Sequence, residues 1–483
     1  MSGNSIEAEI QNIIKHVLKK IVPTEAEREK TLKFSQEIVK KVEEKLKDKG
    51  IVAEVRIEGS IAKDTWLSGD KDIDIFIMVP KVYGREIFPR VLKAAKEAAG
   101  GNYVESYAEH PYLQARIEGF TVEFVPCFKI ERSEEVISSV DRTPFHTAYV
   151  KKRLDANIRD EILLLKKFMH GIGAYGAEIK IGGFSGYLCE LLILYYGSFI
   201  ELLRAASKWR KGEVIDIESF YKGLHNEIRK IFPEPLIVID PVDKGRNVAS
   251  SVRVERLCEF IAASREFLKK PSIEYFFPPE KKPYTIEEVT SAINLRGTSI
   301  VFIKTGAARA VSDILWGQLY RTQRALRNLI LQHDFKLVRD EVWSDEESAV
   351  VFLFELYSRV LPSIEKHIGP PLEKIRDCER FLEKYSGSQT VISGPRIDGD
   401  RWVVERRRKY NDVVHLLRDR LAGDHVKIGI GSLVSQSLSS SFEVLVNSEI
   451  KDFYLQNPGF AKFLTDYLHG KPRWLRADTT KNS

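Results

Sequence analysis

The sequence predicts an α+β protein of several domains, and three observations lead to this prediction. Its 483 residues exceed what one hydrophobic core usually organises, so we expect three or four domains. Segments with a strand-like alternation of apolar residues are interspersed with segments in which apolar residues recur at helical spacing. A proline-rich joint, PSIEYFFPPEKKP at 271–283, separates two such regions and predicts a domain boundary.

The first 150 residues predict a small α/β domain. Two helices open it, and the second begins with Thr24 followed three positions later by Glu27, the pattern of a capping box. Strand patterns and one further helix follow. The expected helices are 6–21, 24–48 and 85–99, and the expected strands are 51–58, 72–79 and 120–126.

The rest of the chain divides at the proline-rich joint. Residues 155–270 are mainly helical in pattern, with apolar stripes that we assign to a core. Beyond the joint the pattern predicts a second α/β domain built on a sheet. The expected elements are strands at 298–305, 335–343 and 349–357, a helix at 313–333, a loop at 386–402 and a mixture of strand and helix at 403–483.

The composition narrows the possible classes of protein. Lys and Arg number 75 against 69 Asp and Glu, a net charge of +6, so nucleic-acid binding would depend on local basic clusters. No apolar run approaches the ~20 residues that span a bilayer. The N-terminus has no apolar stretch of signal-peptide type, so we expect no membrane contact and a cytoplasmic location. The four cysteines form no CxxC pair, which argues against a zinc site or a disulfide framework.

Two aspartates open the strand in WLSGDKDIDIFIMVP. Asp72 and Asp74 are two apart, so on a strand they project from one face and repel each other. A divalent cation removes this conflict, and carboxylate oxygens suit Mg²⁺. Glu123, flanked by apolar residues, adds an acid from a later strand. A lone DxD is often only a solvated strand end, but three acids on adjacent strands predict a two-metal site for phosphoryl or nucleotidyl transfer.

Gly59 and Ser60 end the preceding strand, with eleven residues between Ser60 and Asp72. A small residue lets backbone N–H groups approach a triphosphate, and a serine hydroxyl can donate to it. Together with the carboxylates, this turn predicts a reaction in which the 3′-OH of an acceptor attacks the α-phosphorus of a nucleoside triphosphate and pyrophosphate leaves.

Residues 57–60 (IEGS) followed by 72–75 (DIDI) resemble the signature of the nucleotidyltransferase superfamily that includes DNA polymerase beta. Further blocks, from residue 58 to about 371, resemble archaeal, class I CCA-adding enzymes, the tRNA nucleotidyltransferases. These blocks are EGSIAKDTWL, YAEHPY, VDRTPFH, IGAYGAEIKIGGFSGYLCELL, DPVDKGRNVAS and HIGPPLE.

The resemblance implies a fold and a role for each domain. The fold would be a polymerase beta-like palm, a helical neck, an α/β body with a sheet and an α/β tail. The expected domains are a catalytic head at 1–150, a nucleotide-recognising neck at 151–270, and a tRNA-binding body at 271–370 and tail at 371–483.

The resemblance also implies an activity, the addition of CCA to the 3′ end of tRNA from CTP and ATP without a nucleic-acid template. It implies that Asp72 and Asp74 bind both of two Mg²⁺ ions and that Glu123 completes the site nearest the primer hydroxyl. These three residues would be catalytic. The family usually has Asp at the position of Glu123, and the longer side chain must be absorbed by a backbone shift.

The other nucleotide-binding residues follow from the same resemblance. In the Gly59–Ser60 loop, Ser60 matches the phosphate-binding serine, and Lys63 stands where Arg is frequent. Arg246 matches the arginine that reads the Watson–Crick edge of the incoming C or A. His110 is left open between a ligand and a structural histidine. The remaining implied contacts to phosphate and sugar are Thr143, His146, Lys166 and Tyr175.

The implied partner is tRNA, held at its acceptor and TΨC arm through shape and phosphates rather than base sequence. Arg321, Arg324 and Arg327 recur at helical spacing and are candidate RNA contacts. Arg406 and Arg407 belong to the RRRK cluster and are two more. A homodimer is compatible with the class.

Two other functions stay open. Another RNA-specific nucleotidyltransferase, such as a poly(A) or uridylyl polymerase, would share the carboxylates and differ in the neck motif and in product length. A catalytically silent RNA-binding protein of the same fold would be expected to lack one carboxylate or the Gly-Ser turn, and this chain keeps them all.

Overall fold

The computed structural model describes residues 3–107, 111–132, 135, 137–423 and 425–475. The described chain forms two compact units. The first runs to Glu280 and includes residues 472–475, and the second is Lys281–Lys471. The boundary falls within the proline-rich joint expected from the sequence.

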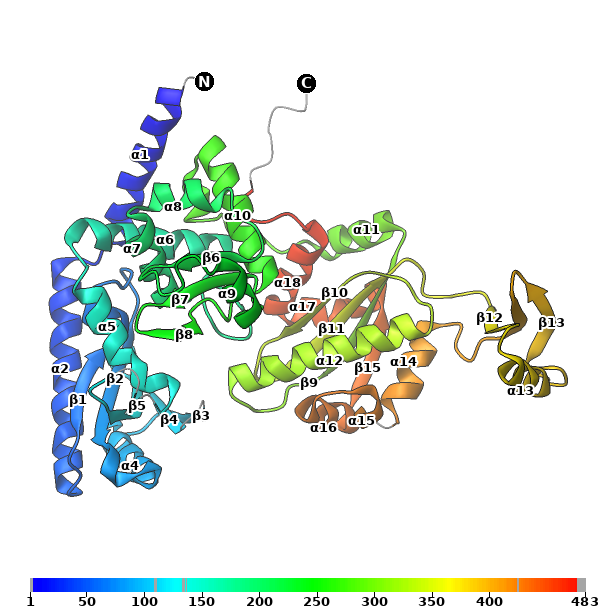
Figure 1. The fold of residues 1–483 in the computed structure, drawn as a ribbon, viewed down its shortest axis with the longest axis horizontal. Coiled ribbons are helices and arrows are strands. Elements are labelled where there is room, and N and C mark those ends of the chain that lie inside the picture. Colours follow the sequence, from blue (N-terminus) through cyan, green and yellow to red (C-terminus); the bar gives the residue numbers. More distant parts are fainter. Residues whose placement is uncertain (1–2, 108–110, 133–134, 136, 424, 476–483) are drawn as a thin grey trace. The chain divides into compact units, whose positions relative to one another are not determined.

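The first unit begins with two helices, α1 (Gly3–Ile21) and α2 (Glu25–Asp48), followed by a five-stranded sheet of order β1-β2-β5-β4-β3 (Figure 1). Strands β2 and β5 pair in parallel and the other neighbours are antiparallel. The remaining elements of this domain are β1 (Glu54–Glu58), α3 (Gly59–Lys63), β2 (Asp72–Pro80), α4 (Phe88–Ala99), β3 (Tyr103–Tyr107), β4 (Pro111–Ile117), β5 (Phe120–Lys129) and α5 (Thr143–Lys151).

Strand β2 separates the core of this domain from its functional face. Ile73, Ile75 and Ile77 are fully buried in a core shared with α2 and α4. Such burial contributes about 2 kcal/mol per side chain. Because neighbouring side chains on a strand point to opposite faces, Asp72 and Asp74 lie on the face away from those helices.

The two opening helices and the capping box are confirmed. The Thr24 hydroxyl accepts from the Glu27 amide at 3.2 Å, and the Glu27 carboxylate accepts from the Thr24 amide at 2.8 Å. These bonds satisfy two amides that the helix itself leaves unpaired. The predicted strands at 51–58, 72–79 and 120–126 are present, whereas β3 and β4 were missed, although Leu113, Ala115 and Ile117 of β4 do alternate with polar residues.

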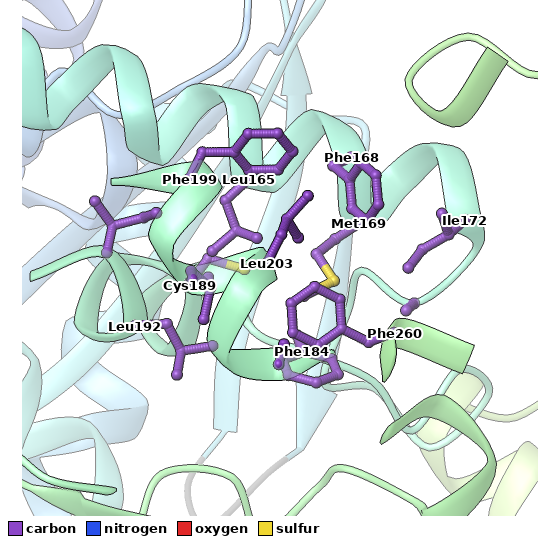
Figure 2. Close-up of a cluster of buried hydrophobic side chains, with 14 of the residues drawn as sticks. Leu165, Phe168, Met169, Ile172, Phe184, Cys189, Leu192, Phe199, Leu203 and Phe260 are labelled. Carbon is purple, nitrogen blue, oxygen red and sulfur yellow. The ribbon is translucent and has the colours of Figure 1, made fainter. Parts of the chain in front are cut away.

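The rest of the first unit is mainly helical, as predicted. Its core gathers aromatic side chains from several helices, including Phe168, Phe199 and Phe260 (Figure 2). A small sheet, β6-β7-β8, was not expected, because the apolar run LIVI at 236–239 shows no alternation and is too short to separate strand from helix. The elements are α6 (Ala156–Ile172), α7 (Gly186–Tyr196), α8 (Phe199–Ala206), β6 (Glu213–Asp216), α9 (His225–Ile231), β7 (Leu236–Asp240), β8 (Asp243–Asn247) and α10 (Val254–Lys269).

Among the residues that the structure describes, no single helix has the length and apolar character needed to cross a membrane. Helices α7 and α8 meet that test only when taken together, and they are bent by 93° where they join.

The second unit is built on a sheet of order β10-β11-β9-β15. The strands and the long helix expected at 298–357 are confirmed. The elements are α11 (Ile286–Arg296), β9 (Ser299–Gly306), α12 (Ser312–Gln332), β10 (Leu337–Ser344), β11 (Ala349–Leu356), α14 (Val413–Leu421), α15 (His425–Ile428), α16 (Ser432–Ser440), β15 (Phe442–Val446), α17 (Lys451–Gln456) and α18 (Pro458–His469).

A second, three-stranded sheet of order β12-β14-β13 lies in the same unit. Its elements are β12 (Ile364–Pro371), α13 (Ile375–Tyr385), β13 (Val391–Asp398) and β14 (Arg401–Arg407). The prediction of a loop at 386–402 was therefore wrong. Two register shifts interrupt β13, and Gly394, within the second of them, has φ +94°, so the apolar alternation that identifies a strand is broken.

Glu355 on β11 provides a test of what stabilises the second unit. Its side chain is 1% exposed and accepts from Arg296 at 2.6 Å, Thr298 at 2.6 Å and Tyr467 at 2.9 Å. Burial raises the pKa of this carboxyl, but the hydrogen bonds from these residues and from Arg339 outweigh it and lower the pKa to about 2. We expect Glu355→Gln to reduce the free energy of unfolding at pH 7 by about 3 kcal/mol, since it leaves the half-buried Arg296 and Arg339 without their buried counter-charge.

The pH dependence follows from the direction of that shift. A carboxyl with a depressed pKa stabilises the fold above its unfolded value near 4.5, and this stabilisation is lost as the pH falls toward 2. Equilibrium urea unfolding should therefore show the difference between wild type and variant shrinking between pH 5 and pH 2. Glu347→Gln, at an exposed position just before β11, is the control. It should change neither the free energy of unfolding at pH 7 nor its dependence on pH. An equal difference at both pH values would contradict the assignment.

Candidate active site

The pairing of β2 with β5 brings together the three carboxylates predicted to be catalytic. Asp74 lies directly opposite Glu123, and Asp72 lies opposite Thr121, two residues earlier on both strands. Paired residues on neighbouring strands project from the same face, so the three acids share one face. A cavity of about 400 Å³ opens there, and its lining includes Asp74, Glu123 and Thr143.

The charges in this cavity repel one another. Burial, followed by the charge of Glu123, raises the pKa of Asp74 to about 7. Burial and the charge of Asp72 also raise the pKa of Glu123, although Gln114 Nε2 donates to its Oε1 at 2.9 Å. In the described ranges, no three His, Cys, Asp or Glu side chains are already gathered closely enough to hold a metal ion. The hard oxygen donors and their mutual repulsion nevertheless fit the chemistry of a divalent cation.

Gly59 lies against one of these carboxylates. It begins α3 immediately after β1, with φ +68°, a left-handed conformation that favours glycine. A Cβ at this position would lie 1.8 Å from Asp74 Oδ2, so no other residue fits without displacing the carboxylate. Ser60, the next residue, is half-buried and its carbonyl accepts from the Thr65 amide at 3.0 Å. The Gly-Ser turn therefore packs directly against Asp74.

Lys63 and Lys166 meet in a buried ionic cluster. Their ammonium groups lie 2.5 Å and 3.0 Å from the two carboxylate oxygens of Glu190, and Lys166 also donates to the Thr65 carbonyl at 2.8 Å. Burial raises the pKa of Glu190, but the charges of Lys166 and Lys63 outweigh it and lower the pKa to about 2. Two lysines around one carboxylate leave a net positive charge in this buried cluster.

Sequence reasoning missed Glu190. The available signal was its isolation as the one charged residue in the apolar run YLCELLILYY, since a charge in a buried helix needs a partner. Tyr175 lies near the same cluster. A Cβ on Gly186 would come within 2.9 Å of the Tyr175 hydroxyl and 3.5 Å of Lys166 Nζ, so Tyr175 and Lys166 converge at the start of α7.

The predicted residues His146 and Arg246 meet at a second buried carboxylate. Asp240 Oδ2 lies 2.7 Å from Arg246 Nη1 and 3.0 Å from His146 Nε2. The His146 ring stacks on Tyr187 with 4.1 Å between ring centroids. Burial lowers the pKa of His146, although the hydrogen bond to Asp240 acts in the opposite direction. The lowered pKa favours a neutral imidazole.

The candidate RNA contacts belong to the second unit and differ in their environment. Arg327 binds Asp340 through two bonds of 2.8 and 2.9 Å, and Arg406 binds Glu365 at 2.7 Å. Arg321 Nε donates to the Gly429 carbonyl at 3.3 Å. Arg324 and Arg407 are exposed. His110 lies outside the described residues.

Three family models match the chain. They are a nucleotidyltransferase domain at residues 39–146, the second domain of tRNA nucleotidyltransferase at 160–277 and the C-terminal domain of CCA-adding enzyme at 296–447.

Two curated relatives cover almost the whole chain. The CCA-adding enzyme of Methanosarcina mazei is 40% identical over 94% of this chain and 97% of its own length. The CCA-adding enzyme of Methanocaldococcus jannaschii is 36% identical over 92% of this chain and 98% of its own length. Among solved structures, the Cid1 poly(U) polymerase bound to Mg 3′-dATP matches with a TM-score of 0.44 and 16% identity, over 55% of this chain and 95% of that one.

Proposed function

The chain belongs to the family of CCA-adding enzymes, and we propose that it adds CCA to the 3′ end of tRNA at the cavity between β2, β5 and α5. The observation that carries this proposal is 40% identity over 94% of the chain, which spans both compact units. The substrates are nucleotides and a divalent metal takes part, as in the family. We propose CTP and ATP as the nucleotides and two Mg²⁺ ions as the metal.

Asp72, Asp74 and Glu123 are the proposed catalytic residues and would hold the metal. A bound divalent cation supplies positive charge that stabilises the developing charge on phosphate and lowers the pKa of the attacking 3′-OH. The chain supports these acids directly. Gly59 packs against Asp74, and Gln114 holds Glu123 by a hydrogen bond. Glu123 thus has a partner that fixes its longer side chain.

The proposed triphosphate contacts are Ser60, Lys63, Thr143, Lys166 and Tyr175. Lys63 and Lys166 have their charge held in place by Glu190, so the positive field of this cluster exists before a nucleotide binds. Such a field attracts a triphosphate without the cost of reorganising flexible side chains.

Arg246 is the proposed reader of the base. A guanidinium carries only donors, so it can bond to cytosine O2 and N3 or to adenine N1. Uracil N3 and guanine N1 carry hydrogens that would face those donors. A site of this kind rejects U and G because buried polar groups would be left unpaired or would clash.

The proposed tRNA contacts lie in the second unit. The exposed residues Arg324 and Arg407 are the stronger candidates, because Arg327 and Arg406 have their guanidinium groups engaged by carboxylates. We propose binding to the acceptor and TΨC arm, assembly as a homodimer and a cytoplasmic location, all by analogy with the class of enzyme that processes tRNA.

The experiment that tests this proposal is single-turnover extension of a tRNA lacking its 3′ CCA, with each labelled nucleoside triphosphate and Mg²⁺. The expected product carries two C residues and then one A, and a metal chelator should abolish its formation. Growth of a homopolymer would identify another RNA-specific nucleotidyltransferase, and an unchanged tRNA would favour a silent RNA-binding protein.

A further inference from the structure

Asp240 is a buried carboxylate on which three separate elements converge. It ends β7 and is 0% exposed. Its oxygens accept from Arg246 on β8 at 2.7 Å, from Tyr187 on α7 at 3.3 Å and from the Val242 amide at 3.1 Å, and they lie 3.0 Å from His146 Nε2 on α5. Both carboxylate oxygens therefore have partners. Arg246 and His146, the two residues expected to contact the nucleotide, share Oδ2.

The hairpin that carries Asp240 is itself held rigidly. Asn247, directly after Arg246, accepts from the Val238 and Ala249 amides at 2.9 Å each and donates to the Leu236 carbonyl at 2.9 Å. The bonds to Val238 and Leu236 join β8 to β7. Asp240 therefore sits on a fixed support, whereas the Arg246 side chain is 34% exposed and takes its direction from the bond to Asp240.

We propose that Asp240 is a positioning residue for base selection, which fixes the guanidinium of Arg246 and the ring of His146 in a single arrangement toward the incoming nucleotide. This inference rests on the proposed role of Arg246 as the reader of the base. An arginine free to rotate can withdraw its donors from a base that presents a hydrogen, whereas a clamped one cannot. Rejection of U and G therefore depends on Asp240 as well as on Arg246.

The test is the selectivity of Asp240→Asn in the full chain, measured as kcat/KM for CTP, ATP, UTP and GTP on tRNA substrates awaiting C or A. Loss of a charge-assisted hydrogen bond at the arginine should reduce the preference for CTP over UTP about tenfold to a hundredfold. KM for CTP should rise about tenfold with a smaller change in kcat. A purely structural role predicts a lower melting temperature with an unchanged preference, and that result would overturn the proposal.

Two further variants make the outcome decisive. Asp243 lies three residues further along the same hairpin, and its carboxylate accepts from Arg142 at 2.9 Å. The control variant Asp243→Asn should leave base preference unchanged. Asp240→Glu keeps the charge and displaces the carboxylate by one methylene, so it should also lower the preference. If Asp240→Asn fails to fold, wild-type selectivity in Asp240→Glu overturns the proposal.

Arg246→Ala separates this inference from the proposed function. If Arg246→Ala keeps wild-type selectivity, the base-reading role of Arg246 is wrong and the inference falls with it. If Arg246→Ala loses selectivity while Asp240→Asn retains it, only the inference is wrong. In the Arg246→Ala background, Asp240→Asn should cause no further loss of selectivity, because the two residues act through one bond.

Discussion

Asp74→Asn is expected to lower the rate of nucleotide addition about a thousandfold or more while leaving the chain folded. The substitution keeps the size of the side chain and removes a charge that the reaction requires. Metal-assisted charge stabilisation accounts for several kcal/mol of a transfer reaction, and each 1.4 kcal/mol is about tenfold in rate. Single-turnover extension of tRNA lacking CCA measures the loss.

Thermal unfolding distinguishes this loss from misfolding. In metal-free buffer at pH 8, Asp74→Asn should melt no lower than wild type, because the amide removes the repulsion between Asp74 and Glu123. Asp48→Asn, an exposed substitution at the end of α2, is the control and should be fully active. Activity within tenfold of wild type in Asp74→Asn would remove Asp74 from the catalytic set.

Gly59→Ala is expected to reduce activity about a hundredfold or more. The new Cβ would lie 1.8 Å from Asp74 Oδ2, so either α3 or the carboxylate must move. Displacement of a catalytic group by about 1 Å is enough for a loss of this size. The left-handed φ of +68° adds a conformational cost of about 1 kcal/mol that affects stability alone.

Gly50→Ala is a matched control for this prediction. Gly50 has a φ of +66°, close to that of Gly59, but an added Cβ there would meet no atom within 4 Å. Both variants should lose the stability that the left-handed conformation costs, with a further loss in Gly59→Ala from its contact with Asp74, and only Gly59→Ala should lose activity. Equal activity in the two variants would show that the contact between Gly59 and Asp74 is unimportant.

The features that could be predicted from the sequence are those that depend on the local periodicity of apolar residues. Alternation around Asp72 and Asp74 predicted a strand with one polar face, and the apolar neighbours of Glu123 predicted its partner strand. The long helix α12 and the strands around it were likewise readable from periodicity. The strand β13 was not, because a bulge and a left-handed glycine break its alternation.

The residues missed at the site share a different property. The roles of Glu190 and Asp240 depend on partners that are distant in the sequence. Glu190 pairs with Lys63, and Asp240 pairs with His146. A sequence states that a buried acid needs a partner but does not state which residue provides it. The predicted roles of individual nucleotide contacts stay predictions for the same reason.

The apolar core beneath the parallel strands β2 and β5 fixes the register that places the proposed catalytic carboxylates side by side. Ile73 lies opposite Val122, and Ile75 lies opposite Phe124. A slip of one residue would turn Glu123 into the apolar interior and present a hydrocarbon side chain beside Asp74. Mutations that loosen this packing, far from any nucleotide, should therefore degrade the rate of transfer before they cost the domain its fold.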